Sequence, residues 1–120
     1  MITGFHALIF SADPPADRAF LRDVFGFPYV DDGDGWLIFK LPPAELGVHG
    51  LRSETQEPFQ GFALMVDDIA ATVADLREKS VIVTEPVDRG FGMVAVLTLP
   101  SGTPLEVYEP RHATAKDLAT

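Results

Sequence analysis

Short apolar runs alternate along the chain with segments whose apolar residues recur every three or four positions. Each change of pattern predicts a change of secondary structure. Residues 3–10, TGFHALIF, form a short apolar run rich in aromatic and branched side chains, which favours a β-strand. Apolar side chains then recur at three- and four-residue steps, Phe20 and Val24 among them, which predicts a helix up to about Phe25. Asp13 is the expected N-cap of this helix.

The segment from residue 27 to residue 50 predicts three strands, because turn-forming clusters divide it. The clusters are DDGDG at 31–35 and LPP at 41–43, whose residue types suit hairpin connections. A polar stretch at 51–58, LRSETQEP, ends in proline and predicts a connector. The first half of the chain is therefore expected to be a βαβββ unit.

The same pattern begins again after the connector. An apolar run, GFALMV, leads to Asp68 at an expected helix start, and Ile69, Val73 and Leu76 follow at helical spacing. Three further apolar runs, VIVTEPV, FGMVAVLTL and PLEVYEP, predict strands, with PSGT as the turn between the last two. The second half therefore also predicts a βαβββ unit.

The two halves match in the spacing of particular residues as well as in the order of their elements. His6 lies seven residues before Asp13, and Gly61 lies seven residues before Asp68, so the two pairs are offset by 55 residues. An internal repeat of this length indicates two modules, each too small to close a core alone. We assign one domain, with module one at 3–50, a connector at 51–58, module two at 59–109 and a tail at 110–120.

Composition limits the partners and the metal ligands that the protein can have. The 120 residues include 18 acidic and 9 basic side chains, a formal net charge of −9 that disfavours nucleic acid as a partner. Cysteine is absent, so any metal ligands have to be histidine and carboxylate side chains. No apolar run reaches the length of a membrane span and no signal-peptide pattern opens the chain, so we expect a soluble cytoplasmic protein with no membrane partner.

Three features together resemble a known family. They are the paired βαβββ units with a histidine seven residues before the helix-opening aspartate, the helix ending RDVFGFPY, and the terminal LEVYEPR. Over residues 3–112 the chain resembles the vicinal oxygen chelate superfamily of glyoxalases, bleomycin-resistance proteins and extradiol dioxygenases. The resemblance implies an α+β fold in which two tandem βαβββ modules form one curved mixed sheet with a central cleft. It also implies a homodimer whose partner completes the cleft.

The resemblance implies up to four metal-ligand positions, on the first and last strand of each module. His6 takes the first-strand position of module one, and Glu106 takes the last-strand position of module two. The other two positions fall on Gly47 and Gly61, which have no ligand atom. Side chains two apart on a strand share a face, so His49 is the candidate that replaces Gly47. His6, His49 and Glu106 then form a metal set suited to iron, manganese, nickel or zinc, with Glu106 also the catalytic candidate.

Each of these side chains also has a purely structural interpretation. His6 is also compatible with an ordinary polar position on a strand, and His49 with one in a groove or at a sheet edge. Glu106 either faces water or has a partner, because a buried carboxylate alone is costly. Aromatic side chains are core residues by default, and Trp36 and Phe91 are the expected exceptions, as walls of a substrate pocket.

Two functions remain open. The first, preferred by a small margin, is a metal-dependent lyase, isomerase, thiol transferase or dioxygenase acting on a small molecule whose oxygen atoms chelate the ion. The second is a metal-free protein that sequesters a small molecule or drug, as bleomycin-resistance proteins do. The acidic composition and the two glycines at ligand positions favour sequestration, because they remove ligands and keep the cleft. His112, in the tail, is expected to be solvated.

Overall fold

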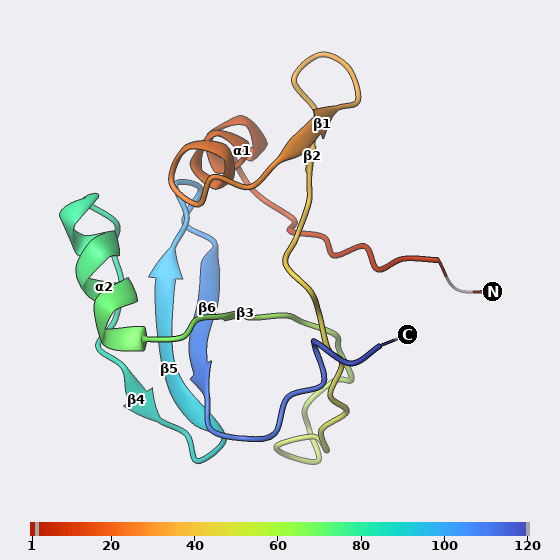
Figure 1. Cartoon of the computed structure of the whole chain (residues 1–120), viewed down its shortest axis with the longest axis vertical. Coiled ribbons are helices and arrows are strands. Elements are labelled where there is room, and N and C mark those ends of the chain that lie inside the picture. The colour runs from red at the N-terminus through yellow and green to blue at the C-terminus, as the bar shows by residue number, and fades with distance from the viewer. Residues whose placement is uncertain (2, 120) are drawn as a thin grey trace.

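The computed structural model describes Met1 and residues 3–119, and in these residues it contains two helices and two sheets (Figure 1). The helices are α1, Pro14–Asp23, and α2, Ile69–Glu78. The strands are β1 (Tyr29–Asp31), β2 (Leu37–Phe39), β3 (Leu64–Met65), β4 (Val87–Asp88), β5 (Gly92–Thr98) and β6 (Pro104–Pro110). The α+β class predicted from the sequence is confirmed.

Both helices begin at the predicted aspartates. The side chain of Asp13 accepts a hydrogen bond from the backbone N–H of Ala16 at 3.3 Å, and that of Asp68 accepts one from Ala71 at 3.0 Å. These bonds satisfy donors that the first turn of a helix leaves without a partner in the helix. α1 ends at Asp23, slightly earlier than predicted.

The second half of the chain forms a four-stranded sheet in the order β3-β6-β5-β4. β3 runs parallel to β6, whereas β5 is antiparallel to both of its neighbours. The β5–β6 ladder is continuous from the pair Gly92↔Pro110 to the pair Thr98↔Pro104. α2 packs against this pair of strands (Figure 1). A strand, a helix and three strands therefore follow one another in the order that the sequence predicts for this half.

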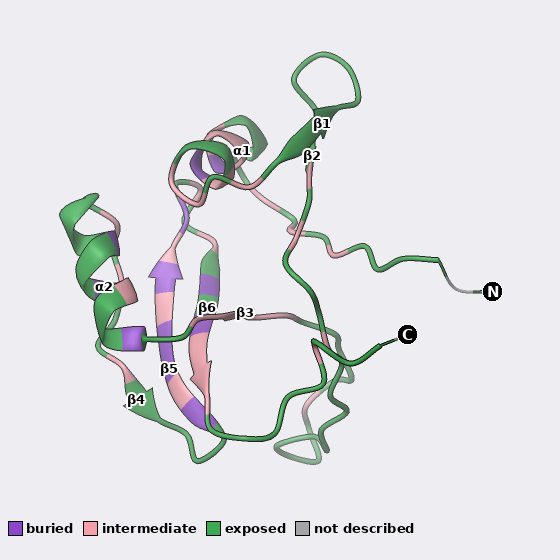
Figure 2. Ribbon diagram, in the orientation of Figure 1, coloured by how far each residue is buried: buried purple, intermediate pink, exposed green. Residues whose placement is uncertain are grey.

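The core lies between this sheet and the helices, where Figure 2 shows the buried residues. Alternate side chains of β5 and β6 point toward α2, so Leu97 and Val107 are buried together with Val73. Phe20 of α1 belongs to the same cluster. The first half of the chain is thus attached to the second through one shared core.

A buried carboxylate strengthens this attachment. Asp17 on α1 is 4% exposed, and its two oxygens accept hydrogen bonds from the backbone N–H of Ser101 at 3.0 Å and from its hydroxyl at 2.7 Å. Ser101 lies in the predicted turn between β5 and β6. The turn and α1 therefore lie side by side at one end of the sheet (Figure 1).

The first half contributes α1 and one antiparallel hairpin, β1–β2. The DDGDG cluster forms the turn of this hairpin, as predicted. The backbone N–H of Trp36 donates to the carbonyl of Gly33 at 3.0 Å, and Asp34 adopts a positive φ of 54°. Aspartate tolerates this left-handed conformation better than most residues, which explains why the turn is rich in Asp and Gly.

Two predicted strands of the first half do not form among the described residues. Residues 3–10 and 44–50 pair with no strand there, and Phe10, Leu46 and Val48 are strongly exposed. The physical reason is that a strand requires a partner for its backbone hydrogen bonds, whereas its apolar pattern requires only the local sequence. The tandem βαβββ arrangement and its module boundaries therefore stay a prediction.

Candidate functional site

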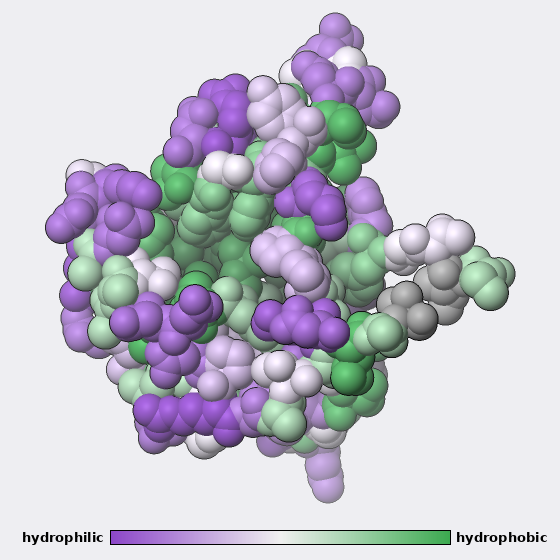
Figure 3. All heavy atoms as spheres, viewed as in Figure 1, coloured by the Kyte–Doolittle hydropathy of each residue, from purple (hydrophilic) through white to green (hydrophobic). Residues whose placement is uncertain are grey.

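A cleft of about 1150 Å³ lies beside β6, and both halves of the chain contribute to its walls. The walls come from the N-terminal segment, the residues that follow α1, residues 41–47, β3, α2, β6 and the C-terminal segment. They include the aromatic side chains of Phe5, Phe25, Phe27, Phe62, Phe91 and Tyr108. In Figure 3 hydrophobic residues occupy the hollowed centre of the molecule and hydrophilic residues surround it. The size and lining suit a bulky organic molecule.

β6 presents two polar side chains to this cleft because alternate residues of a strand face opposite sides. Leu105 and Val107 are buried in the core, so Glu106 and Tyr108 project from the other face. Glu106 lies opposite Val96 in the β5–β6 ladder. A carboxylate and a phenol thus stand two residues apart on one face of the strand, and both line the cleft.

Three rings lie in sequence along the cleft wall. The rings of Phe91 and Tyr108 meet edge to face at 5.7 Å between centroids, and the ring of His112 stacks on Tyr108 at 6.1 Å. Nδ1 of His112 lies 2.8 Å from the carbonyl of Ala113, and because a carbonyl only accepts, Nδ1 donates there. Its Nε2 then accepts the hydroxyl hydrogen of Tyr108 across 3.3 Å. The tyrosine hydroxyl is held in this way at the surface of the cleft.

The glutamates of the cleft differ in the partners they have. Glu109 accepts a hydrogen bond from the backbone N–H of Ile69 at 3.2 Å, at the start of α2. Glu45 accepts one from the backbone N–H of Ala115 at 3.2 Å. Glu106 forms no hydrogen bond or ion pair with any described residue. Of these three acids, Glu106 is the one whose carboxylate is free to meet a ligand.

The cleft has an excess of negative charge. Its lining includes the carboxylates of Glu45, Asp67, Asp75, Glu106 and Glu109 but the ammonium group of Lys116 alone among lysine and arginine side chains. Burial raises the pKa of the Tyr108 hydroxyl, and the charge of Glu45 raises it further. The pKa of Lys116 is raised by its hydrogen bond to Asp117 and by other nearby acids, including Glu45. Such a field attracts cations and disfavours anions.

The structure does not bring the predicted metal set together. His6 is exposed on the N-terminal segment, and Nδ1 of the exposed His49 donates to the carbonyl of Gly50 at 2.6 Å. Only Glu106 of the three lines the cleft. Within the described part of the chain, no three His, Asp or Glu side chains lie close enough to share a metal ion. The donors of one chain therefore do not fit a metal centre, and this metal set stays a prediction.

The other predicted positions divide between the cleft and the surface. Gly47 and Gly61 both line the cleft; they occupy the two expected ligand positions that have no ligand atom. Phe91 also lines the cleft, as predicted for a pocket wall. Trp36 does not line the cleft: it lies beside the β1–β2 hairpin, 57% exposed, where the guanidinium of Arg18 stacks 4.4 Å from its ring centroid. Trp36 is therefore not part of the wall of this cleft, and its role in a substrate pocket stays a prediction.

Sequence reasoning missed Tyr108, Glu45 and His112 as parts of the cleft. Tyr108 could be identified from the sequence, because a residue two positions after Glu106 on a strand lies on the same face as Glu106. Glu45 shares the predicted face of Gly47 by the same alternation, whereas no local signal identifies His112. The contact between Glu45 and the C-terminal segment, and the position of His112, depend on where that segment runs after β6. That path is fixed by contacts between distant parts of the chain, such as the bond from Ala115 to Glu45.

Solved structures show where this fold occurs. The antibiotic binding protein TnmS3 of Streptomyces sp. CB03234 is 23% identical, with a TM-score of 0.62 over 92% of this chain and 99% of that one. Lactoylglutathione lyase from Agrobacterium tumefaciens is 22% identical, with a TM-score of 0.63 over 89% of this chain and 92% of that one. At these identities the likeness concerns the fold. No curated protein matches the chain.

Two further findings bear on classification. Neither described helix is long and apolar enough to cross a membrane. The sequence matches the Glyoxalase/Bleomycin resistance protein/Dioxygenase superfamily over residues 5–107. Because this match spans most of the chain and agrees with the motifs and the fold, the protein belongs to the Glyoxalase/Bleomycin resistance protein/Dioxygenase superfamily.

Proposed function

We propose that this protein binds a bulky, aromatic organic cation in the cleft beside β6 and sequesters it without a metal ion. The observation that carries the proposal is Glu106, an acid with no partner among the described residues, on the wall of an apolar cleft of about 1150 Å³. The side chain of Glu106 is exposed on this wall, so its carboxylate is accessible to a cationic ligand, with which it can form a charge-assisted hydrogen bond.

The surrounding rings support the same class of ligand. Phe91 and Tyr108 offer aromatic surface in the same cleft as Glu106, and aromatic faces attract both flat rings and cationic groups. Glu45 adds a second negative charge at the same wall. The fold is also compatible with this function, since the antibiotic binding protein TnmS3 has a similar one.

Calorimetry tests the proposal directly. Titration with metal-free bleomycin, doxorubicin and ethidium in the presence of EDTA is expected to give saturable heat at micromolar concentration with at least one of these aromatic cations. Glu106→Gln removes the charge and keeps the shape, so affinity for that probe falls by about tenfold. Glu54→Gln, on the exposed connector, is the matched control and leaves the affinity unchanged.

Two outcomes contradict the proposal. One is the absence of binding heat with all three cations. The other is an equal loss of affinity in Glu106→Gln and Glu54→Gln, which would mean that net charge, rather than the cleft, governs the interaction.

A metal-dependent enzyme of the lyase, isomerase, thiol transferase or dioxygenase class is the second candidate, and the orientation of His49 favours it. Because Nδ1 of His49 donates to Gly50, its Nε2 retains a lone pair for a metal ion. The set still requires His6 and Glu106 to approach it. Zinc, nickel, manganese and iron content after loading and desalting tests this candidate. One ion per chain, lost in both His49→Ala and Glu106→Ala but kept in His112→Ala, would support it.

We also infer a second copy of the chain as the protein partner. The offset of 55 residues relates Ile9 of module one to Leu64 of module two, and aligning LGV at 46–48 with LEV at 105–107 relates Val48 to Val107. Leu64 and Val107 are paired strand residues in β3 and β6. The corresponding segments, 3–10 and 44–50, expose apolar side chains and have no strand partner among the described residues. Pairing with the same segments of a second copy would supply the missing backbone hydrogen bonds.

A further inference from the structure

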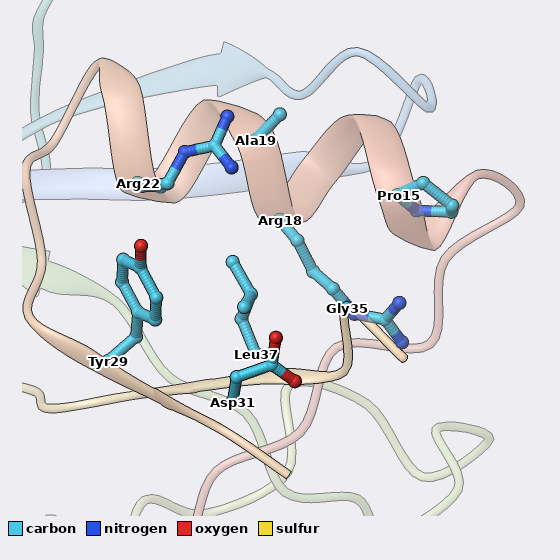
Figure 4. Close-up of a pocket in the computed structure, with 8 residues that line it drawn as sticks. All are labelled: Pro15, Arg18, Ala19, Arg22, Tyr29, Asp31, Gly35 and Leu37. Atoms are coloured by element: carbon cyan, nitrogen blue, oxygen red, sulfur yellow. The ribbon is translucent and has the colours of Figure 1, made fainter. Parts of the chain in front are cut away.

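A second, smaller cavity of about 260 Å³ lies between α1 and the β1–β2 hairpin, and it shares no lining residue with the cleft (Figure 4). Arg18 and Arg22 stand one helical turn apart on α1 and both line it. Tyr29 and Asp31 face them from the hairpin, and Leu37 lies between the charged groups. The cavity thus combines donors, an acceptor and an apolar surface in a space suited to a small molecule.

The guanidinium groups provide hydrogen-bond donors that the protein does not use. The flat face of Arg18 stacks on Trp36 at 4.4 Å, which fixes the group and leaves its N–H edge available. No described carboxylate forms an ion pair with Arg18. Arg22 binds Asp23 through Nε at 2.7 Å and one Nη at 2.9 Å, so its other Nη remains available.

Asp31 places a hydrogen-bond acceptor on the opposite wall. Its Oδ1 accepts a hydrogen bond from the backbone N–H of Gly33 at 2.8 Å, which anchors the side chain. Its Oδ2 has no partner among the described residues. The acid also limits the choice of ligand, because its negative charge opposes a doubly charged anion such as a phosphate monoester.

We propose that this cavity binds a small monocarboxylate with a hydroxyl or ammonium group on the neighbouring carbon. The carboxylate meets the N–H edge of Arg18, since a guanidinium matches a carboxylate in geometry and charge, and Arg22 adds a second positive charge to the wall. The hydroxyl or ammonium group donates to Asp31, and the carbon chain contacts Leu37. The site is independent of the function proposed for the cleft.

Fluorescence of Trp36 reports on this site alone, because Trp36 is the only tryptophan of the chain. Glycolate and glycine represent the two donor types, and acetate and inorganic phosphate are the comparison ligands, all at constant ionic strength. Glycolate or glycine is expected to change the emission saturably at millimolar concentration, with acetate and phosphate weaker. Arg18→Gln weakens binding about tenfold, as measured by calorimetry because the substitution alters the emission itself. Arg52→Gln, on the exposed connector, has no effect.

Asp31→Asn separates the two donor types, because an amide oxygen still accepts from a hydroxyl but no longer pairs with an ammonium group. This substitution is expected to weaken the binding of glycine and to leave the binding of glycolate nearly unchanged. The proposal is overturned if neither ligand gives a saturable response. It is also overturned if acetate or phosphate binds as tightly as they do, or if Arg52→Gln matches Arg18→Gln. Shifts of the Leu37 methyl resonances in NMR spectra provide a second reading of occupancy.

Discussion

Asp17 is a charged side chain in the core, and its position is stable only because both carboxylate oxygens have donors from Ser101. Ser101 in turn shares its hydroxyl with Thr103 at 2.8 Å. Such a network fixes α1 against the turn between β5 and β6. At the scale of single residues, the clearest predictions concern Asp17 and Tyr108.

Asp17→Ala is expected to lower the free energy of unfolding by about 2 kcal/mol, because it leaves the partly buried donors of Ser101 without their acceptor. Urea unfolding followed by circular dichroism measures the change. Glu54→Ala, at an exposed position, should alter stability little. A loss as small as that of Glu54→Ala would show that the Asp17 network does not hold the two elements together.

Tyr108 predicts how stability depends on alkaline pH. Burial and then Glu45 raise the pKa of its hydroxyl in the folded state, so the folded protein holds this proton more tightly than the unfolded chain does. The resulting stability is complete below about pH 10 and is lost as pH rises through the raised folded pKa. Tyr108→Phe should remove this part of the alkaline decline in the free energy of unfolding. An unchanged decline in that variant would assign the effect to other groups.

At the scale of elements, the β5–β6 ladder depends on one close approach. Gly92 is buried, and a Cβ atom at that position would lie 2.5 Å from the carbonyl oxygen of Glu109 and 3.0 Å from a ring carbon of Tyr108. Real side chains do not tolerate such distances to backbone. Because glycine has no side chain, β5 and β6 remain paired as far as the edge of the cleft.

Gly92→Ala is expected to destabilise the protein by about 2 kcal/mol and to disturb the ring of Tyr108, because the strands have to separate to admit the methyl group. Thermal unfolding measures the first effect, and near-ultraviolet circular dichroism of the aromatic residues measures the second. Gly61→Ala is the matched control, since a Cβ atom there meets only ordinary contacts. Equal behaviour of the two variants would contradict the close packing of β5 on β6.

At the scale of the whole molecule, the exposed segments 3–10 and 44–50 predict self-association. Val48 is 94% exposed and lies in a segment without a strand partner, whereas Val30 is 65% exposed on the paired hairpin. Light scattering after gel filtration is expected to give the mass of two chains for the native protein. Val48→Lys should shift it toward one chain, and Val30→Lys should not. A native monomer at micromolar concentration would refute the inferred partner.

The sequence by itself determined the features that depend on neighbouring residues. Asp13 and Asp68 begin the helices because a side-chain oxygen next to the first turn finds free N–H groups there. The turn at 31–35 and the shared face of Glu106 and Tyr108 follow in the same way from local conformation and alternation. The family motifs also lie in these local features, which is why the superfamily was accessible from the sequence.

Only the tertiary structure decided what lies around the cleft. It left His6 and His49 outside, put His112 on the wall beside Tyr108, and placed Trp36 outside the cleft, stacked on the guanidinium of Arg18. These placements depend on which distant segments pair and on the path of the chain after β6. Strand pairing and loop paths are set by contacts between residues far apart in the chain, and no local pattern of hydrophobic and polar residues specifies them.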